Sequence, residues 1–283
     1  MNSVSIKQNE EEMLKYQFAA RVYYNRAELI NFLIWVFCVI SASCVFISVD
    51  ALWFQGIPLA ADIIAAWLGI KLSRTLSNAS LLRSYFDAYV LNIDIDSFED
   101  STVRRIKEIS TKIILSKCED YREQIINTGN DVPPGVRDWY DIPASYSEKN
   151  AQFECQKQNC WWNKKMTHKR FLLNILFAVF AALVVFFAVR NVSIGDSIII
   201  GVFGSGAIIM RCIERFSANK QYHDLSQQID GAVEALSESR DIKNIYRLQK
   251  LINKRRELPI LEMNFIHKRI AKPLSEMYHN FLS

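Results

Sequence analysis

Two clusters of aromatic, amide and charged side chains in the middle of the chain are the residues best suited to ligand binding. They are Arg137, Asp138, Trp139, Tyr140 and Asp141 in VRDWYD, and Gln156, Gln158, Asn159, Trp161 and Trp162 in FECQKQNCWWNKKM. Aromatic faces stack on nucleobases and arginine forks pair with phosphates, so these types could hold a nucleotide. Two other interpretations stay open. Tryptophans followed by lysines are typical of a lipid headgroup interface, and indole rings also pack turns against helices.

No motif in the sequence would make these clusters catalytic. There is no glycine-rich phosphate loop, no serine elbow and no paired metal motif. Cys155 and Cys160 lack the two-residue spacing of zinc knuckles, and His168 lies eight residues further on. We therefore expect no enzymatic activity, no metal and no cofactor.

Four apolar blocks must position the clusters, and each is long enough for a membrane helix of roughly 20 residues. They span residues 30–49, 58–76, 171–189 and 192–210. The second and fourth are the weaker, because Asp62 lies in one and Asp196 near the start of the other; a buried hairpin of a soluble protein is their alternative. The short links DALWFQGI and RN predict two antiparallel hairpins.

Positive charge orients these hairpins. Of the 34 lysines and arginines, only Arg190 lies in a link. The positive-inside rule therefore predicts that both termini and the segment between the hairpins are cytoplasmic. The polar start MNSVSIKQNEEEMLKY predicts no cleavable signal peptide. A net charge of +4 is too small to suggest binding to a nucleic-acid polymer.

Small residues at spacings of four in the second and fourth blocks predict close helix packing. These candidate packing positions are Ala65, Gly69, Ser197, Gly201 and Ser205. They pack either within one chain or, in one of the two rows, against another copy in an oligomer.

Asp62 is the one acidic residue well inside a block. Counted from Pro58 at ~1.5 Å per residue, it is expected roughly 6 Å below the outer mouth. An outer-interface position that reaches water is the favoured interpretation, and a pore-lining role is the alternative.

The fold class that follows is all-α: a polytopic membrane protein with four transmembrane helices in two hairpins and a helical cytosolic domain built from the middle and C-terminal segments. We divide the chain into a cytosolic N-terminal helix (1–28), hairpin one (29–76), a cytosolic helical domain (77–170), hairpin two (171–210) and a cytosolic C-terminal helical region (211–283). Pro133 and Pro134 predict a turn-rich break within the middle domain. An apolar stripe after the fourth span needs a partner: Leu225, Ile229, Val233 and Leu236.

The two central motifs also carry a family resemblance. VRDWYD and FECQKQNCWWNKKM, together with ARVYYNRAELINF and the tail IYRLQKLINKRRELPILEMNFIHKR, resemble the SMODS-associated four-transmembrane effector family. Members of that family accompany cyclic-oligonucleotide synthases in bacterial anti-phage systems of the CBASS type.

This resemblance implies an effector of the bacterial inner membrane with a functional link to a nucleotidyltransferase. A cyclic oligonucleotide would bind the cytosolic helices, and the protein would oligomerise and disrupt or permeabilise the membrane, causing abortive infection. Further candidate ligand contacts, beside Arg137, are Arg104, Arg105 and Arg122. The alternative is a membrane scaffold that recruits a cytosolic partner through the apolar stripe without forming a pore.

Overall fold

The structure, a computed structural model, describes residues 2–44, 52–129, 131–143, 145–189, 194–238 and 241–259. Its helices are α1 (Ser3–Lys7), α2 (Glu11–Cys44), α3 (Leu52–Leu91), a 3-10 turn η1 (Ile95–Ser97), α4 (Asp100–Ser116), α5 (Cys118–Gln124), α6 (Glu148–Val189), α7 (Ile194–Glu238) and α8 (Ile242–Arg256). Within these residues the only bridge between extended segments is an isolated one, Thr128 with Arg137, so the predicted all-α fold is confirmed.

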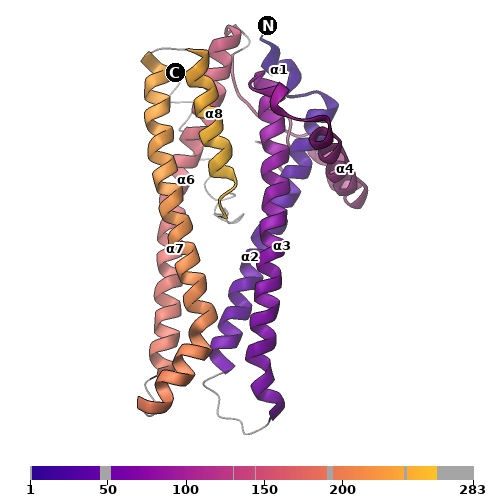
Figure 1. Ribbon diagram of the computed structural model, residues 1–283. Helices are drawn as coiled ribbons and strands as arrows, with labels where there is room; N and C mark the ends of the chain where they lie inside the picture. The colour runs from indigo at the N-terminus through magenta and orange to yellow at the C-terminus, as the bar shows by residue number, and fades with distance from the viewer. Residues whose placement is uncertain are drawn as a thin grey trace.

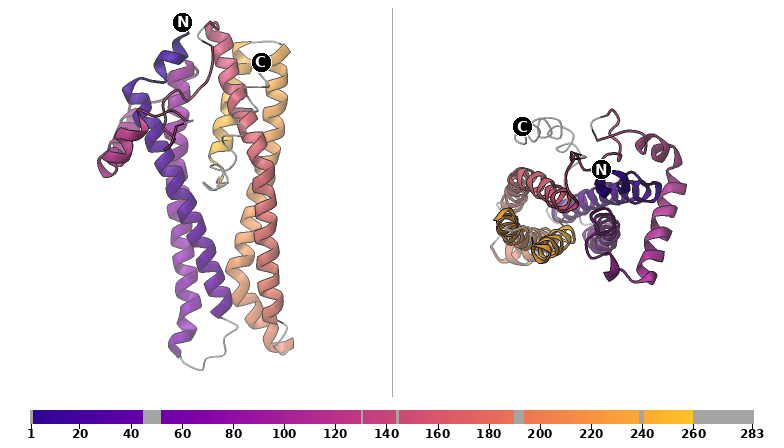
Figure 2. Two further views of the ribbon diagram at one scale, coloured as in Figure 1. Left: turned by 180° about the vertical axis from the view of Figure 1, so that it is seen from behind. Right: turned by 90° about the horizontal axis from the view of Figure 1, so that it is seen from above.

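Four long helices run side by side as two antiparallel hairpins, α2 with α3 and α6 with α7 (Figure 1). The short helices α1, α4 and α8 lie at one end of this bundle, as Figure 1 and the left view of Figure 2 show. We call this the polar end. The opposite, apolar end consists of residues 30–44, 52–76, 171–189 and 194–210 of the long helices.

Each long helix joins an apolar segment to a polar one without a break. The sequence predicted this for α6, which runs into the third apolar block, and for α7, which extends the fourth. Between helices, the predicted break at the two prolines is also present, since the described residues between Gln124 and Glu148 form no helix.

The start of α3 corrects one prediction. The link between the first two blocks was expected to reach residue 57, but the chain is helical from Leu52, and Pro58 lies inside the helix at the cost of one backbone hydrogen bond. Asp62 lies ten residues into α3, about 15 Å from its start. Its depth in the membrane stays a prediction.

Two clusters of buried apolar side chains hold the bundle together. The cluster at the polar end contains Phe18, Phe86 and Ile106 together with residues of α6 and α8. Of the predicted apolar stripe, Ile229 and Leu236 belong to this cluster and Val233 packs against it. Leu225 is buried as well, so the stripe has its partner within the chain. The cluster at the apolar end joins α2, α3 and α7 and includes Ile34, Leu68 and Ile208.

Two described helices, Glu11–Cys44 and Gly56–Leu91, are long and apolar enough to cross a membrane. Large apolar side chains are exposed around the apolar end; they include Phe32, Leu59, Ile63, Trp67, Leu176 and Ile209. A surface of this kind suits lipid contact. The side chains of Ser197, Gly201 and Ser205, and all of residues 260–283, lie outside the described part of the chain.

Candidate functional site

A fully buried carboxylate, Asp87 of α3, is the centre of a polar network at the polar end. Its Oδ1 accepts a hydrogen bond of 2.7 Å from the hydroxyl of Tyr140. Its Oδ2 lies 2.7 Å from Nη2 of Arg256 and accepts a bond of 3.2 Å from Nε2 of Gln249, both on α8. The carboxylate therefore ties α3 to α8 and to the loop that precedes α6.

The network continues into α6 through two amide side chains. Nδ2 of Asn159 donates to the Tyr140 hydroxyl at 2.8 Å. Nε2 of Gln156, which is fully buried, donates to Oε1 of Gln249 at 3.1 Å and to the carbonyl of Ile245 at 3.2 Å. Burial, and next the charge of Asp87, raise the pKa of Tyr140 well above its ordinary value. The phenol stays neutral, as donation to Asp87 requires.

The loop that carries Tyr140 is fixed from the N-terminal side. The side-chain amide of Gln8 both accepts from the backbone N–H of Tyr140, at 2.8 Å, and donates to its carbonyl, at 3.2 Å. Asn9 accepts from the backbone N–H of Asp138 at 3.0 Å and donates to its side-chain carboxylate at 2.6 Å, and the φ of Asp138, 48°, is left-handed. The N-terminal segment, α3 and α6 therefore all contact this loop.

Arg83 lies one helical turn before Asp87, and its guanidinium carbon stands 4.0 Å from the ring centroid of Trp139. Burial, and next the nearby charge of Arg256, lower the pKa of Arg83 to about 10. Its Nη1 is buried and has no hydrogen-bond partner among the described residues. An unpaired guanidinium N–H in such a place is costly and favours an acceptor with negative charge.

Arg21 adds a third guanidinium to this region. Its Nη1 donates to the carbonyl of Pro134 at 2.7 Å and its Nη2 to the carbonyl of Gly135 at 2.6 Å. Burial, followed by the charge of Arg83, lowers the pKa of Arg21 to about 10. Arg256 pairs with Asp87, Arg83 lies near both of them, and Arg21 lies near Arg83, so three guanidiniums share this region with one buried carboxylate. The described region therefore carries an excess of positive charge. Chemically it suits an anion that has several oxygen acceptors, such as a phosphodiester.

The structure brings half of the predicted ligand-binding residues together. Trp139, Tyr140, Gln156 and Asn159 belong to the network. Asn159 joins the turn to α6 through Tyr140, Trp139 contacts Arg83 of α3, and Gln156 joins α6 to α8.

The other predicted residues lie outside the network. Arg137 and Asp141 are exposed. Trp161 and Trp162 are half-buried on α6, with their rings edge to face and the centroids 6.0 Å apart. Asp62, Ala65 and Gly69 lie in the first half of α3, at the apolar end and away from the network. Ala65 is buried, whereas no described atom comes within 4 Å of a Cβ built on Gly69.

Sequence reasoning missed the residues that organise the network, Arg83, Asp87, Gln249 and Arg256. One signal was present: Asp87 interrupts an apolar helical face, four residues after an arginine, in LLRSYFDAYVL. An acidic residue at such a position must be paired if the face is buried.

Comparison with curated proteins finds no match, and comparison with solved structures finds none either. The family model of the SMODS-associating 4TM effector domain matches residues 2–280, nearly the whole chain. Its description fits the exposed apolar surface and the two membrane-length helices. The protein therefore belongs to the family of SMODS-associating 4TM effectors, and it is a membrane protein.

Proposed function

We propose that the protein is a gated effector of the bacterial inner membrane, without enzymatic activity. In this proposal four helices span the membrane, and the polar end and both termini are cytoplasmic. A cyclic oligonucleotide made by a partner nucleotidyltransferase binds the polar end. The chain, as a homo-oligomer, then permeabilises the membrane and causes abortive infection. Family membership supports the link to the nucleotidyltransferase and the role as an effector.

The observation that carries this proposal is the continuity of α3. This helix has 40 residues, hence a length of about 60 Å, and it contains both Asp62 in the apolar end and the pair Arg83 and Asp87 in the polar network. Helix α6 likewise contains Gln156 and Asn159 before it enters the third apolar block. A ligand that changes the network would therefore move helices that continue into the membrane.

The unpaired charge supplies the chemistry of recognition. A phosphodiester oxygen would satisfy Nη1 of Arg83 and neutralise the excess charge beside Arg256, and the Trp139 ring offers a face for a base. Taking a two-state switch from 1:99 to 99:1 needs about 5.5 kcal/mol of differential binding. Two or three charge-assisted hydrogen bonds, at about 1.5–3 kcal/mol each, meet that requirement.

A binding titration tests the ligand site. The purified protein in lipid nanodiscs is titrated with a panel of cyclic di- and trinucleotides, and the variant Arg83→Gln is compared with Arg247→Gln. Arg247 is exposed on α8 and serves as the matched control. Loss of one charge-assisted bond predicts roughly 10- to 100-fold weaker binding for Arg83→Gln alone. Equal affinities for the two variants would refute this site, and Arg137→Gln then tests the exposed cluster.

The scaffold alternative depended on an exposed apolar stripe, and the stripe is not exposed. Leu225, Ile229 and Leu236 of the apolar stripe are buried, and Val233 is partly buried, against the chain's own α6 and α8. These side chains are therefore not available to recruit a separate protein in this conformation.

A further inference from the structure

Polar atoms are buried within the seam where α2, α3 and α7 meet at the apolar end. Oγ of Ser41, Oδ1 of Asp62 and Nε of Arg211 reach no solvent and have no hydrogen-bond partner among the described residues. Inside a bilayer each such atom costs several kcal/mol unless water reaches it. A seam that keeps three of them is suited to hold water.

These polar groups form two layers along the seam. In the layer nearer the polar end, Nη2 of Arg211 donates to Oδ1 of Asn31 at 2.6 Å, and Nη1 pairs with Oε2 of Glu214 at 3.0 Å. The deeper layer contains Ser41 and Asp62. The sulfur of Cys38 lies 4.0 Å from the carbonyl of Ala207. Cys38 is within electrostatic reach of both Arg211 and Asp62, which places it between the two layers and brings α2, α3 and α7 together here.

An apolar layer separates the two. Ile34 lies between Asn31 and Cys38 along α2, and Ile208 lies one turn before Arg211 on α7. Both side chains are almost fully buried, with exposed fractions of 3% and 1%, and they pack with Leu68 in one cluster. A constriction made of such apolar side chains excludes water and so blocks ions, even where the backbones of the helices stay apart.

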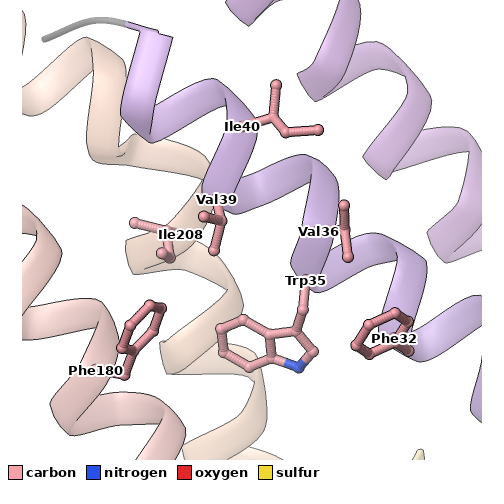
Figure 3. Close-up of a pocket in the computed structure, with 7 residues that line it drawn as sticks. All are labelled: Phe32, Trp35, Val36, Val39, Ile40, Phe180 and Ile208. Atoms are coloured by element: carbon pink, nitrogen blue, oxygen red, sulfur yellow. The ribbon is translucent and has the colours of Figure 1, made fainter.

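A cavity beside this layer gives it room to move. A pocket of about 240 Å³ lies between α2, α6 and α7. It is lined by Phe32, Trp35, Val36, Val39, Ile40, Phe180 and Ile208, and Figure 3 shows Ile208 beside Val39 at its edge. Phe32 and Phe180 on its wall are 57% and 53% exposed, so the pocket opens to the outer surface of the bundle. Close-packed interiors resist rearrangement, whereas a side chain beside an open pocket shifts without displacing packed protein atoms.

We propose that this seam is a closed path for small cations within each chain, with Ile34, Leu68 and Ile208 as its gate and Asp62 as the charge that favours cations. Movement of Ile208 into the adjoining cavity joins the two polar layers through water and opens the path. This inference rests on the proposed function and adds the route by which the membrane becomes permeable.

The test is the resting potassium leak and membrane potential of cells that express single variants without the synthase. Ile208→Ser makes the gate polar, and Ile34→Ser does the same from the other helix if the first variant fails to accumulate. The matched control is Ile209→Ser, because the neighbouring Ile209 is 45% exposed and faces away from the seam. We expect depolarisation without synthase for the gate variants only, and less potassium leak when Asp62→Asn is added.

The outcomes separate this inference from the proposed function. If wild type depolarises with the synthase but both gate variants remain silent without it, the gate is wrong and the effector stands. Leak from Ile209→Ser equal to that from Ile208→Ser also overturns the gate. If wild type remains polarised with the synthase while Ile208→Ser leaks, the path is supported and the proposed activation fails. A further arm uses Val39→Phe, which fills the cavity and is expected to abolish the response of wild type to the synthase.

Discussion

Replacing Asp87 by asparagine removes the negative charge on which the polar network depends. The side chain is fully buried and its two oxygens accept from Tyr140, Gln249 and Arg256. An asparagine of the same shape leaves the Arg256 guanidinium without its counter-charge and close to that of Arg83. Removing one partner of a buried ion pair costs about 3–5 kcal/mol. At about 2–4 °C per kcal/mol, the apparent melting temperature should fall by roughly 6–20 °C.

The assay is thermal melting of the purified protein in detergent, followed by intrinsic fluorescence. Asp96→Asn is the matched control, because Asp96 is exposed just after the same helix. The double variant Asp87→Asn with Arg256→Met removes the stranded charge and should recover at least half of the loss. A melting temperature for Asp87→Asn within error of that for Asp96→Asn would refute the assignment of Asp87 as the centre of the network.

Three further predictions follow from single contacts. Arg83→Met should raise the apparent melting temperature by a few degrees, since burial costs the charged form on the order of 3 kcal/mol and the Trp139 contact returns only about 1–2 kcal/mol. The same variant should bind the nucleotide roughly 10- to 100-fold more weakly, because it lacks the charge-assisted bond; a lower melting temperature contradicts this. Gly135→Ala should open the loop to trypsin, because its Cβ would stand 1.7 Å from the carbonyl oxygen of Asn127, whereas Gly129→Ala meets nothing within 4 Å and should leave cleavage unchanged. Maleimide should label exposed Cys118 much faster than Cys155, whose burial shields the thiol and raises its pKa well above its ordinary value, and mass spectrometry reads the ratio.

Periodicity and helix breakers predicted the helices well because these signals are local. The break around Pro133 and Pro134, and the run of α6 into the third apolar block, both follow from neighbouring residues. The start of α3 was misplaced for the same reason. Pro58 is a local sign of a helix start, and the helix nevertheless begins six residues before it, at Leu52.

The network could not be predicted in the same way, because its partners are far apart in sequence. Asp87 bonds residues 53 and 162 positions away. The sequence showed that Trp139, Tyr140, Gln156 and Asn159 had types suited to recognition. It did not show that Tyr140 would bond Asp87 and Asn159, or that Gln156 would bond Gln249 of α8. The sequence also contained no sign that Nη1 of Arg83 would be buried without a partner, because that depends on segments far away along the chain.

The central claim is that the product of the synthase binds the polar end and thereby makes the membrane permeable through the apolar end. The most direct measurement is membrane potential, followed by a voltage-sensitive dye, in cells that express this protein with and without its nucleotidyltransferase, for wild type and for Arg83→Gln. The account predicts rapid depolarisation only when wild type and synthase are present together, and none with Arg83→Gln at equal abundance in the membrane fraction. A potential that persists in wild type while the cyclic nucleotide is verified in the cells would contradict it.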